Sequence, residues 1–285
     1  MKPASFTYHD PRTVDEVLGL LASLEDVRLL AGGQSLMPML SMRLIQPMNI
    51  IDLNRVEELS YIHLDGDVLE IGAMTRQRDL EFSDLVRDAL PLMYEAVRYV
   101  GHRQTRNRGT IGGSLCQLDP SAELVTVAAA VDAMVIVASP SGRREIPFAA
   151  FPAGLMTPAI EANEMLVAIR FPLWKRGHGY SFEEFARRHG DFAVASAAAL
   201  LECDGERIKR ARVTLGGVAT QPQTLSTTHL EGTIASAAVF DEAATGCDAL
   251  EAMNDVNYTD EYRRHIAKAL VRRALRKAYD RIANH

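Results

Sequence analysis

Two short glycine-centred segments contain the residues best suited to binding a ligand. The first reads Leu29-Leu30-Ala31-Gly32-Gly33-Gln34-Ser35-Leu36, and the second contains Thr110-Ile111-Gly112-Gly113-Ser114. Glycine has no Cβ and adopts positive φ readily, so the backbone of a Gly-Gly pair approaches a ligand closely. Successive N–H groups in such a turn form a concave anion-binding surface, to which Ser and Thr hydroxyls add donors. Both segments are therefore predicted to bind phosphate oxygens, and together they suit a diphosphate.

Each segment also has a purely structural interpretation. The first is equally consistent with a tight turn from a strand into a helix. For the second, the alternative is a mobile surface loop, which the pattern favours less than a binding role. Neither matches the GxGxxG dinucleotide fingerprint or continues into the Lys-Ser or Lys-Thr of a P-loop, so a Rossmann domain is not supported. The chain has no HExxH or GxSxG motif and no clear Cys–His nucleophilic pair. No side-chain catalytic group is predicted.

Composition narrows the class of protein. Of 285 residues 47% are hydrophobic, and 37 acidic residues against 31 Lys and Arg give a net charge of −6. This balance argues against a nucleic-acid partner, because phosphate binding needs excess positive charge. Three separated cysteines (Cys116, Cys203 and Cys247) lack metal-ligand spacing, so no zinc or iron–sulfur site is expected in this chain. Few cysteines, a polar N-terminus and only short apolar runs predict a cytoplasmic, not an integral membrane, protein.

Apolar spacing predicts the elements that position the two segments. A helix is expected over 14–24, with Thr13 and Glu16 as a capping box. A buried strand should run into Gly32, and Ser35 is expected to cap a short helix. Asp65-Gly66 is typical of a two-residue hairpin turn. Further helices are expected at 84–100 and 123–131, further strands at 50–53, 133–137 and 166–171, and a loop at 102–114.

The composition of the chain changes at 172–179, where a proline, two glycines and charged residues occur together. Beyond this segment the pattern predicts strands at 192–202 and 211–218, joined by a turn at Asp204-Gly205. A closing helix should present an apolar stripe from Ile266 to Ile282. We therefore expect a mixed α/β N-terminal portion and a smaller α+β C-terminal portion.

In combination, the motifs strongly resemble one family. AGGQSL at 31–36, RNRGTIGGSL at 106–115 and DPSAEL at 119–124 are similar to the FAD-binding medium subunit of molybdenum hydroxylases, the carbon monoxide dehydrogenase and xanthine dehydrogenase family. Phe6, Tyr8 and Pro11, IDLNR at 51–55, IGAMT at 71–75 and ARRHGDFAVASAAALL at 186–201 extend the resemblance over nearly the whole chain. It implies an α+β fold: a PCMH-type FAD-binding domain at 1–175, with subdomains at about 1–57 and 58–175, then a carbon monoxide dehydrogenase flavoprotein C-terminal domain at 176–285.

The resemblance also implies site residues. Leu29–Leu36 would wrap the FAD pyrophosphate, and Thr110–Ser114 would reach the diphosphate and flavin from the other side. Glu123 matches a position that contacts the adenosine part, although an acid stabilised at a helix N-terminus explains it nearly as well. Leu166 matches an apolar residue packed near the cofactor, which is compatible with ordinary core packing.

Asp191 and Phe192 match a pair that lies near the isoalloxazine. Phe192 would shield one flavin face, with a core phenylalanine as the equal alternative. Xanthine-type relatives carry a lysine near 182–184 that touches the cofactor, whereas this chain has Glu183 and Glu184. That contact is therefore not expected here.

The function implied by the resemblance is electron transfer through FAD. A large subunit with the molybdenum cofactor would act on the substrate. A small subunit with two [2Fe–2S] clusters would pass electrons to this chain, which would transfer them to NAD, a quinone or O2. The expected assembly is a heterohexamer, a dimer of heterotrimers. A stand-alone FAD oxidoreductase of the same fold and a flavin-free scaffold subunit stay open as alternatives, although a scaffold does not need two Gly-Gly pairs.

Overall fold

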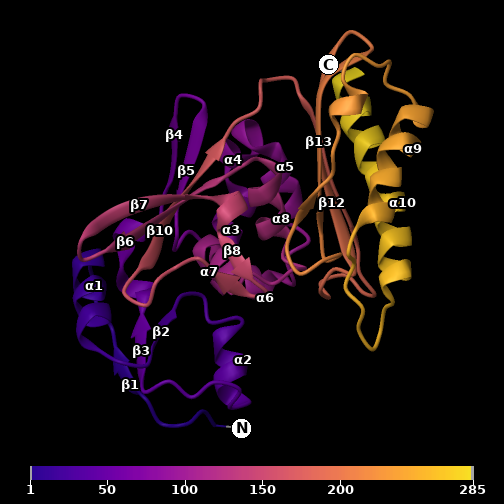
Figure 1. Ribbon diagram of the computed structural model, residues 1–285. Helices are drawn as coiled ribbons and strands as arrows, with labels where there is room; N and C mark the ends of the chain where they lie inside the picture. Colours follow the sequence, from indigo (N-terminus) through magenta and orange to yellow (C-terminus); the bar gives the residue numbers. More distant parts are fainter. Residues whose placement is uncertain (1, 284–285) are drawn as a thin grey trace.

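The computed structural model describes residues 2–283, and its first unit is a small parallel sheet with two helices (Figure 1). The strand order of this sheet is β1-β3-β2, and both pairings are parallel. In Figure 1, α1 and α2 lie on opposite sides of the strands. The elements are β1 (Thr7–His9), α1 (Val14–Ser23), β2 (Val27–Leu30), α2 (Leu36–Ser41), β3 (Asn49–Asp52), and the 3-10 turns η1 (Leu53–Arg55) and η2 (Glu57–Leu59).

The second unit combines an antiparallel sheet of order β4-β5-β10-β6-β7 with a group of short helices. Its strands are β4 (Ile62–Asp65), β5 (Val68–Gly72), β6 (Met134–Ser139), β7 (Gly142–Pro147) and β10 (Met165–Pro172). The helices are α3 (Gln77–Phe82), α4 (Asp84–Ala89), α5 (Pro91–Ala96), α6 (Arg103–Arg108), α7 (Ile111–Gln117) and α8 (Glu123–Ala130). Between β7 and β10 lie η3 (Phe148–Ala150), β8 (Pro152–Gly154) and β9 (Thr157–Pro158).

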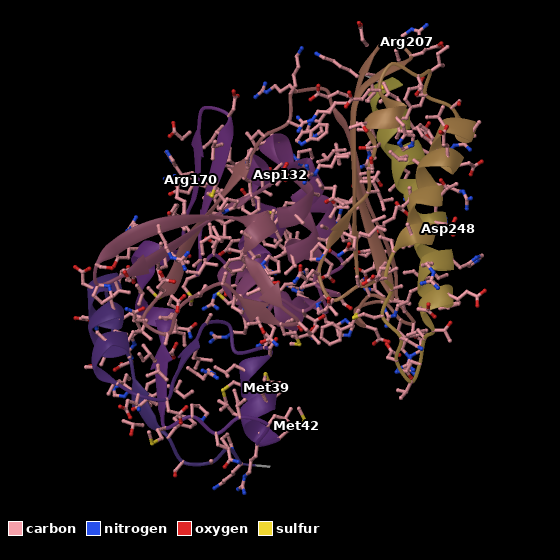
Figure 2. The ribbon with its side chains drawn as sticks, in the orientation of Figure 1. Met39, Met42, Asp132, Arg170, Arg207 and Asp248 are labelled. Atoms are coloured by element: carbon pink, nitrogen blue, oxygen red, sulfur yellow. The ribbon has the colours of Figure 1, made fainter. Side chains whose placement is uncertain are left out.

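The third unit is an antiparallel sheet of order β11-β12-β13-β14, covered on its outer face by helices. Met39 on α2 and Met42, the residue that follows α2, lie far from Arg207 and Asp248 of this unit (Figure 2). Its elements are β11 (Gly179–Phe185), β12 (Ala195–Asp204), β13 (Arg207–Gly216), β14 (Gln223–Thr224), η4 (Thr228–Leu230), α9 (Ala237–Thr245), η5 (Gly246–Ala249) and α10 (Asp260–Ala283).

Strand β12 shows how the layers are joined. Ala198 and Leu200 belong to the core shared with α5 and α8, whereas Ala199 and Leu201 belong to the core shared with α9 and α10. Side chains on a strand alternate between its two faces, so a strand buried on both faces needs an apolar residue at nearly every position. The apolar run at 195–201 therefore lies in a central strand between two helical layers.

Most predicted elements are confirmed, with small shifts in detail. The Thr13 hydroxyl accepts the Glu16 N–H at 3.2 Å, as the capping box requires. The Glu16 carboxylate, however, accepts from the N–H of Arg12 at 2.6 Å and not from Thr13. In the first hairpin Asp65 pairs with Val68, so the turn begins one residue later than predicted.

Three predictions about elements were wrong. The helical stretch expected at 84–100 ends at Ala96 and is divided into α4 and α5, because Pro91 lacks the N–H needed to continue a helix and begins α5 instead. The strand expected from 192 begins at Ala195, and the carbonyl of Ala193 accepts a hydrogen bond from Ser121 Oγ at 2.9 Å. The loop expected at 102–114 forms α6 and the start of α7. Within the described residues, no helix is long and apolar enough to cross a membrane.

Candidate functional site

The structure brings the two glycine segments into contact. A Cβ on Gly32 would lie 2.3 Å from the carbonyl oxygen of Arg108 and 2.7 Å from Cα of Gly109. A Cβ on Gly113 would lie 3.5 Å from Cβ of Ala31. Because Gly32 has no side chain, the two backbones pack directly against each other. The segments thus border one surface, as a shared ligand requires.

The first segment carries a row of unused backbone donors. Among the described residues, the N–H groups from Gly32 to Leu36 find no hydrogen-bond acceptor. Gly33 has φ of +73°, in the left-handed region that favours glycine, and Ser35 is right-handed. Left-handed and right-handed residues next to one another turn successive N–H groups toward one concave side, and Gly33 and Ser35 lie only two residues apart. This row of five donors, 32–36, is the strongest anion-binding feature of the chain.

Two side-chain amides hold the first segment in shape. Gln34 donates from Nε2 to the carbonyl of Gly32 at 3.2 Å, and Asn54 donates from Nδ2 to the carbonyl of Ala31 at 3.0 Å. The predicted cap is absent, because the Ser35 side chain makes no capping hydrogen bond to α2. The Ser35 hydroxyl therefore stays available as a further donor beside the row.

The second segment differs from its prediction, because its backbone donors are already used. Ile111 donates to the carbonyl of Thr75 at 3.1 Å, and Gly112 to that of Ala73 at 2.9 Å. The N–H of Gly113 is bound by the Thr110 hydroxyl at 3.1 Å, which caps α7. What this segment offers a ligand is the hydroxyl of Ser114, the proton of the Thr110 hydroxyl and the close approach of its backbone.

Gly112 serves packing, and its replacement should destabilise the fold. A Cβ there would lie 2.7 Å from the carbonyl oxygen and 2.8 Å from Cβ of Ala73. We expect Gly112→Ala to lower the free energy of unfolding by about 2 kcal/mol through overpacking, with or without flavin. The measurement is urea unfolding of the flavin-free chain. The control is Gly19→Ala in α1, where a Cβ has no neighbour within 4 Å. Equal stability of the two variants would contradict this role.

Sequence reasoning missed a polar cluster at the junction of the two segments. Asn54 Oδ1 accepts from Arg76 Nη2 at 2.5 Å and from Arg108 Nη2 at 3.4 Å, and Arg76 Nη1 donates to the Arg108 carbonyl. Burial, followed by the charge of Arg108, lowers the pKa of Arg76. Arg106, two residues before Arg108, forms an ion pair with Glu81, with 2.8 Å between Nε and Oε2. The IDLNR motif was the available signal for Asn54.

The structure groups Glu123 with two other carboxyls. Glu123 begins α8 and is 8% exposed; burial raises its pKa to about 7, helped by the charge of Asp119. Burial, with the charge of Glu123, raises the pKa of Glu184 to about 8. Glu184 Oε2 is buried without a hydrogen-bond partner and lines a hollow of about 540 Å³ together with Arg98 and Tyr99. Near pH 7 the Glu184 carboxyl is protonated.

The three remaining predicted site residues have different environments. Leu166 is 3% exposed and belongs to the same core as Ile111. Phe192 is 75% exposed, so its interpretation as a core residue was wrong. Asp191 lies 3.8 Å from the guanidinium of Arg187, in the same surface loop as Phe192.

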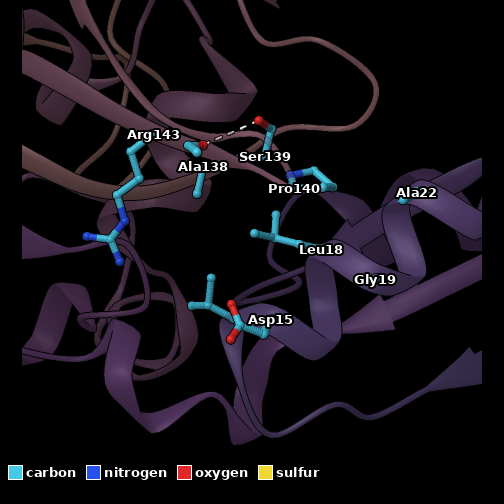
Figure 3. Close-up of a pocket in the computed structure, with 10 residues that line it drawn as sticks. Asp15, Leu18, Gly19, Ala22, Ala138, Ser139, Pro140 and Arg143 are labelled. Carbon is cyan, nitrogen blue, oxygen red and sulfur yellow. Dashed lines mark hydrogen bonds between the residues drawn. The ribbon is translucent and has the colours of Figure 1, made fainter.

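A second hollow, of about 440 Å³, lies between α1 and the β6–β7 hairpin (Figure 3). Asp15, Leu18 and Arg143 line it, with small and apolar neighbours. It shares no residue with the two glycine segments, and α1 lies across the N-terminal sheet from α2 (Figure 1). This hollow has no row of free donors, and we assign it no ligand.

Comparison with known families accounts for the geometry. The FAD binding domain in molybdopterin dehydrogenase matches residues 4–174, and the CO dehydrogenase flavoprotein C-terminal domain matches residues 180–278. The chain belongs to the FAD-binding medium subunits of molybdenum hydroxylases. As a medium subunit it is an FAD-dependent oxidoreductase component, and the family resemblance and fold class expected from the motifs are confirmed.

Individual relatives match this medium subunit from end to end. It is 36% identical to the carbon monoxide dehydrogenase medium chain of Hydrogenophaga pseudoflava, over 99% of this chain and 100% of that one. It is also 36% identical to the 6-hydroxypseudooxynicotine dehydrogenase complex subunit alpha of Paenarthrobacter nicotinovorans, over 99% and 97% of the two chains. A solved structure of the H. pseudoflava carbon monoxide dehydrogenase, which lacks the Mo-pyranopterin moiety of the molybdenum cofactor, matches with a TM-score of 0.95 at 36% identity, covering 99% of each chain.

The residues present fit FAD, the cofactor of this family. The row of donors at 32–36 is unpaired, and the close approach at Gly32 leaves no room for a side chain. Beside them, Arg76 and Arg108 add two positive charges. Unpaired N–H groups together with guanidinium groups are the donors that a diphosphate requires.

Proposed function

We propose that this medium subunit binds FAD across its two glycine segments and passes electrons from a partner subunit to an external acceptor. The observation that carries the proposal is the row of unpaired N–H groups at 32–36, in backbone contact with the second segment. When bound, FAD supplies the redox chemistry, and the protein supplies binding, orientation and electrostatics. This division of labour explains why no side-chain nucleophile or acid–base pair is predicted from the sequence.

Each group of binding residues would contact a different part of the cofactor. Leu29–Leu36 would hold one side of the diphosphate, and Thr110–Ser114 would hold the other through hydroxyl groups. Glu123, whose pKa is about 7, offers both a donor and an acceptor to ribose hydroxyls near neutral pH. Leu166 would pack near the cofactor from the core, and Asp191 and Phe192 would lie beside the flavin ring.

The partners in this proposal are two other subunits. A large subunit would hold the molybdenum cofactor and act on the substrate, and a small subunit with two [2Fe–2S] clusters would deliver electrons. The acceptor would be NAD, a quinone or O2, and the whole would be a dimer of heterotrimers. Support comes from the relatives' names, which describe a medium chain and a subunit alpha of a complex, and from the Mo-pyranopterin named for the H. pseudoflava enzyme.

The same proposal divides the chain into an FAD-binding domain at 1–175, with subdomains at about 1–57 and 58–175, and a C-terminal domain at 176–285. The family matches, which end at 174 and resume at 180, support this division. The packing adds that the C-terminal sheet shares a core with α5 and α8. The two domains are thus joined through an apolar interface.

The visible spectrum of the chain purified alone tests the proposed function. We expect flavin absorption and release of about one FAD per chain on denaturation. A colourless, folded chain that also fails to take up added FAD would leave the flavin-free scaffold as the better interpretation. Substrate oxidation by the chain without partners would instead favour a stand-alone oxidoreductase.

Phe192 provides a narrower prediction about the flavin ring. We expect Phe192→Ala to weaken FAD binding about 5-fold, the value of one aromatic stacking contact, while the unfolding temperature of the flavin-free chain stays unchanged because the ring is exposed. FAD titration monitored by flavin fluorescence measures the effect. Phe82→Ala is the matched control, since Phe82 is 65% exposed on α3. Equal affinities of the two variants would remove Phe192 from the site.

A further inference from the structure

Two guanidinium groups meet at the junction of the glycine segments with no carboxylate between them. Arg76 and Arg108 both donate to Oδ1 of Asn54, at 2.5 Å and 3.4 Å. Within residues 2–283, neither guanidinium has a carboxylate oxygen within 4.0 Å. Asp79 and Asp52 act on Arg76 only at longer range, and Asp52 already accepts hydrogen bonds from Tyr8 and from the N–H of Asn54. Two positive charges therefore share one neutral oxygen.

Three other partly exposed arginines of this chain each have a carboxylate partner. Arg106 lies 2.8 Å from Glu81, Arg212 lies 2.5 Å from Asp132, and Arg281 lies 2.7 Å from Glu95. Withdrawing a charge from water is costly unless a counter-charge compensates it, so the half-buried guanidinium of Arg76, beside the positive charge of Arg108 and without a carboxylate, is unfavourable. Such a pair is favourable once an anion binds between or beside the two groups.

The position of the pair indicates which anion. The carbonyl of Arg108, which accepts from Arg76, is the atom against which Gly32 packs. Asn54, which accepts from both guanidiniums, also donates to the carbonyl of Ala31 at 3.0 Å. The charges are thus tied through hydrogen bonds to the segment that carries the unpaired N–H groups at 32–36.

We propose that Arg76 and Arg108 bind the diphosphate group of a dinucleotide, with Asn54 as the positioning residue that holds both guanidiniums against the first segment. The proposal rests on the proposed function and names binding residues beyond the two glycine segments. The guanidinium fork matches phosphate oxygens bidentately, and two forks match two phosphates. Asn54 supplies a neutral acceptor, which orients the arginines without cancelling their charge.

Three flavins that share the isoalloxazine ring and ribityl chain but carry none, one or two phosphates test this assignment; FAD alone also carries adenosine. Riboflavin has none, FMN has one and FAD has two, and their affinities for the flavin-free chain are measured by fluorescence titration. We expect the double variant Arg76→Gln/Arg108→Gln to bind FAD about 100-fold more weakly, because it loses two charge-assisted contacts. The affinity for FMN should fall by a smaller factor, and riboflavin should bind the double variant as tightly as it binds the unaltered chain.

Further variants separate charge from folding. Arg108→Gln alone alters an exposed side chain, so it should fold normally and lose about 10-fold in FAD affinity. Asn54→Asp places a carboxylate where both guanidiniums donate. It should weaken the binding of FAD and leave the binding of riboflavin unchanged. Arg78→Gln on α3 is the matched control, since its guanidinium contacts Asn107 and the ring of Phe82 and not the junction.

The possible outcomes are distinct. Equal FAD affinities of the double variant and Arg78→Gln, or equal losses for riboflavin and FAD, would overturn the assignment of the diphosphate to this pair and leave the proposed function standing. Failure of the unaltered chain to bind any of the three flavins would overturn the proposed function itself. A rise in the FAD dissociation constant with salt that is steeper for the unaltered chain than for the double variant would support the pair.

Discussion

Gly32→Ala should yield a folded chain that retains almost no FAD. The added Cβ would lie 2.3 Å from the carbonyl oxygen of Arg108 and 2.7 Å from Cα of Gly109, both of which are backbone atoms that cannot rotate away. The two segments must then separate, and a ligand held from both sides loses the contacts of one. We expect a loss of at least about 100-fold in affinity, equivalent to two charge-assisted hydrogen bonds. The measurement is flavin released per purified chain.

Two controls separate the effect of the junction from the general cost of losing a glycine. Gly19→Ala adds a methyl group in open space on α1 and should leave flavin content unchanged. For Gly33, whose φ is +73°, the matched control is Gly177, whose φ is +83° and whose Cβ would meet nothing within 4 Å. Both alanine variants have the same backbone strain in the left-handed region. A larger loss of FAD in Gly33→Ala than in Gly177→Ala would therefore come from lost contacts with the ligand. Full flavin content in Gly32→Ala would contradict the assignment of the first segment.

The second large effect is expected on the pH dependence of stability. In the folded chain the pKa of Glu184 is about 8 and that of Glu123 about 7, above the ordinary value of 4.5. Between about pH 4.5 and 8 the folded chain therefore holds protons that the unfolded chain has released. Stability from these groups is complete below pH 4.5 and is lost as the pH rises through the folded pKa values.

Glu184→Gln removes the larger part of this dependence. Glutamine keeps a donor and an acceptor but needs no proton, so the variant should be more stable than the unaltered chain at pH 9 by on the order of 3 kcal/mol. At pH 4.5 the difference should nearly vanish. Urea unfolding of the flavin-free chain at pH 4.5, 7 and 9 measures it, with exposed Glu57→Gln as the control. Parallel pH profiles for the variant and the unaltered chain would disprove the assignment.

Several features followed from the sequence by itself, because their physical cause is local. A close backbone approach and a positive φ require glycine, so Gly32 and Gly33 marked the first segment directly. A strand buried on both faces requires an apolar residue at nearly every position, which β12 has from Ala195 to Leu201 except at Ser196. The order of several motifs along nearly the whole chain was specific enough to indicate the family. In each case one short stretch of chain contains the whole cause.

Tertiary structure alone decided the rest. Residues 103–108 and 111–117 are helical although the second helix contains Gly112 and Gly113. Arg106 pairs with Glu81, and the start of α7 bonds to the backbone of Ala73 and Thr75, which outweighs the weak helix propensity. The same backbone contacts consumed the donors that the second Gly-Gly pair was expected to expose.

The charge environment was equally hidden from the sequence. Asn54, Arg76 and Arg108 come from three separate segments, 22 and 32 residues apart, and no local pattern predicts that they share one oxygen. Whether Phe192 is exposed or buried, and whether Glu184 keeps its proton, depends on which other segments surround each side chain. Burial and charge are properties of the packed neighbourhood, and that neighbourhood is assembled from residues distant along the chain.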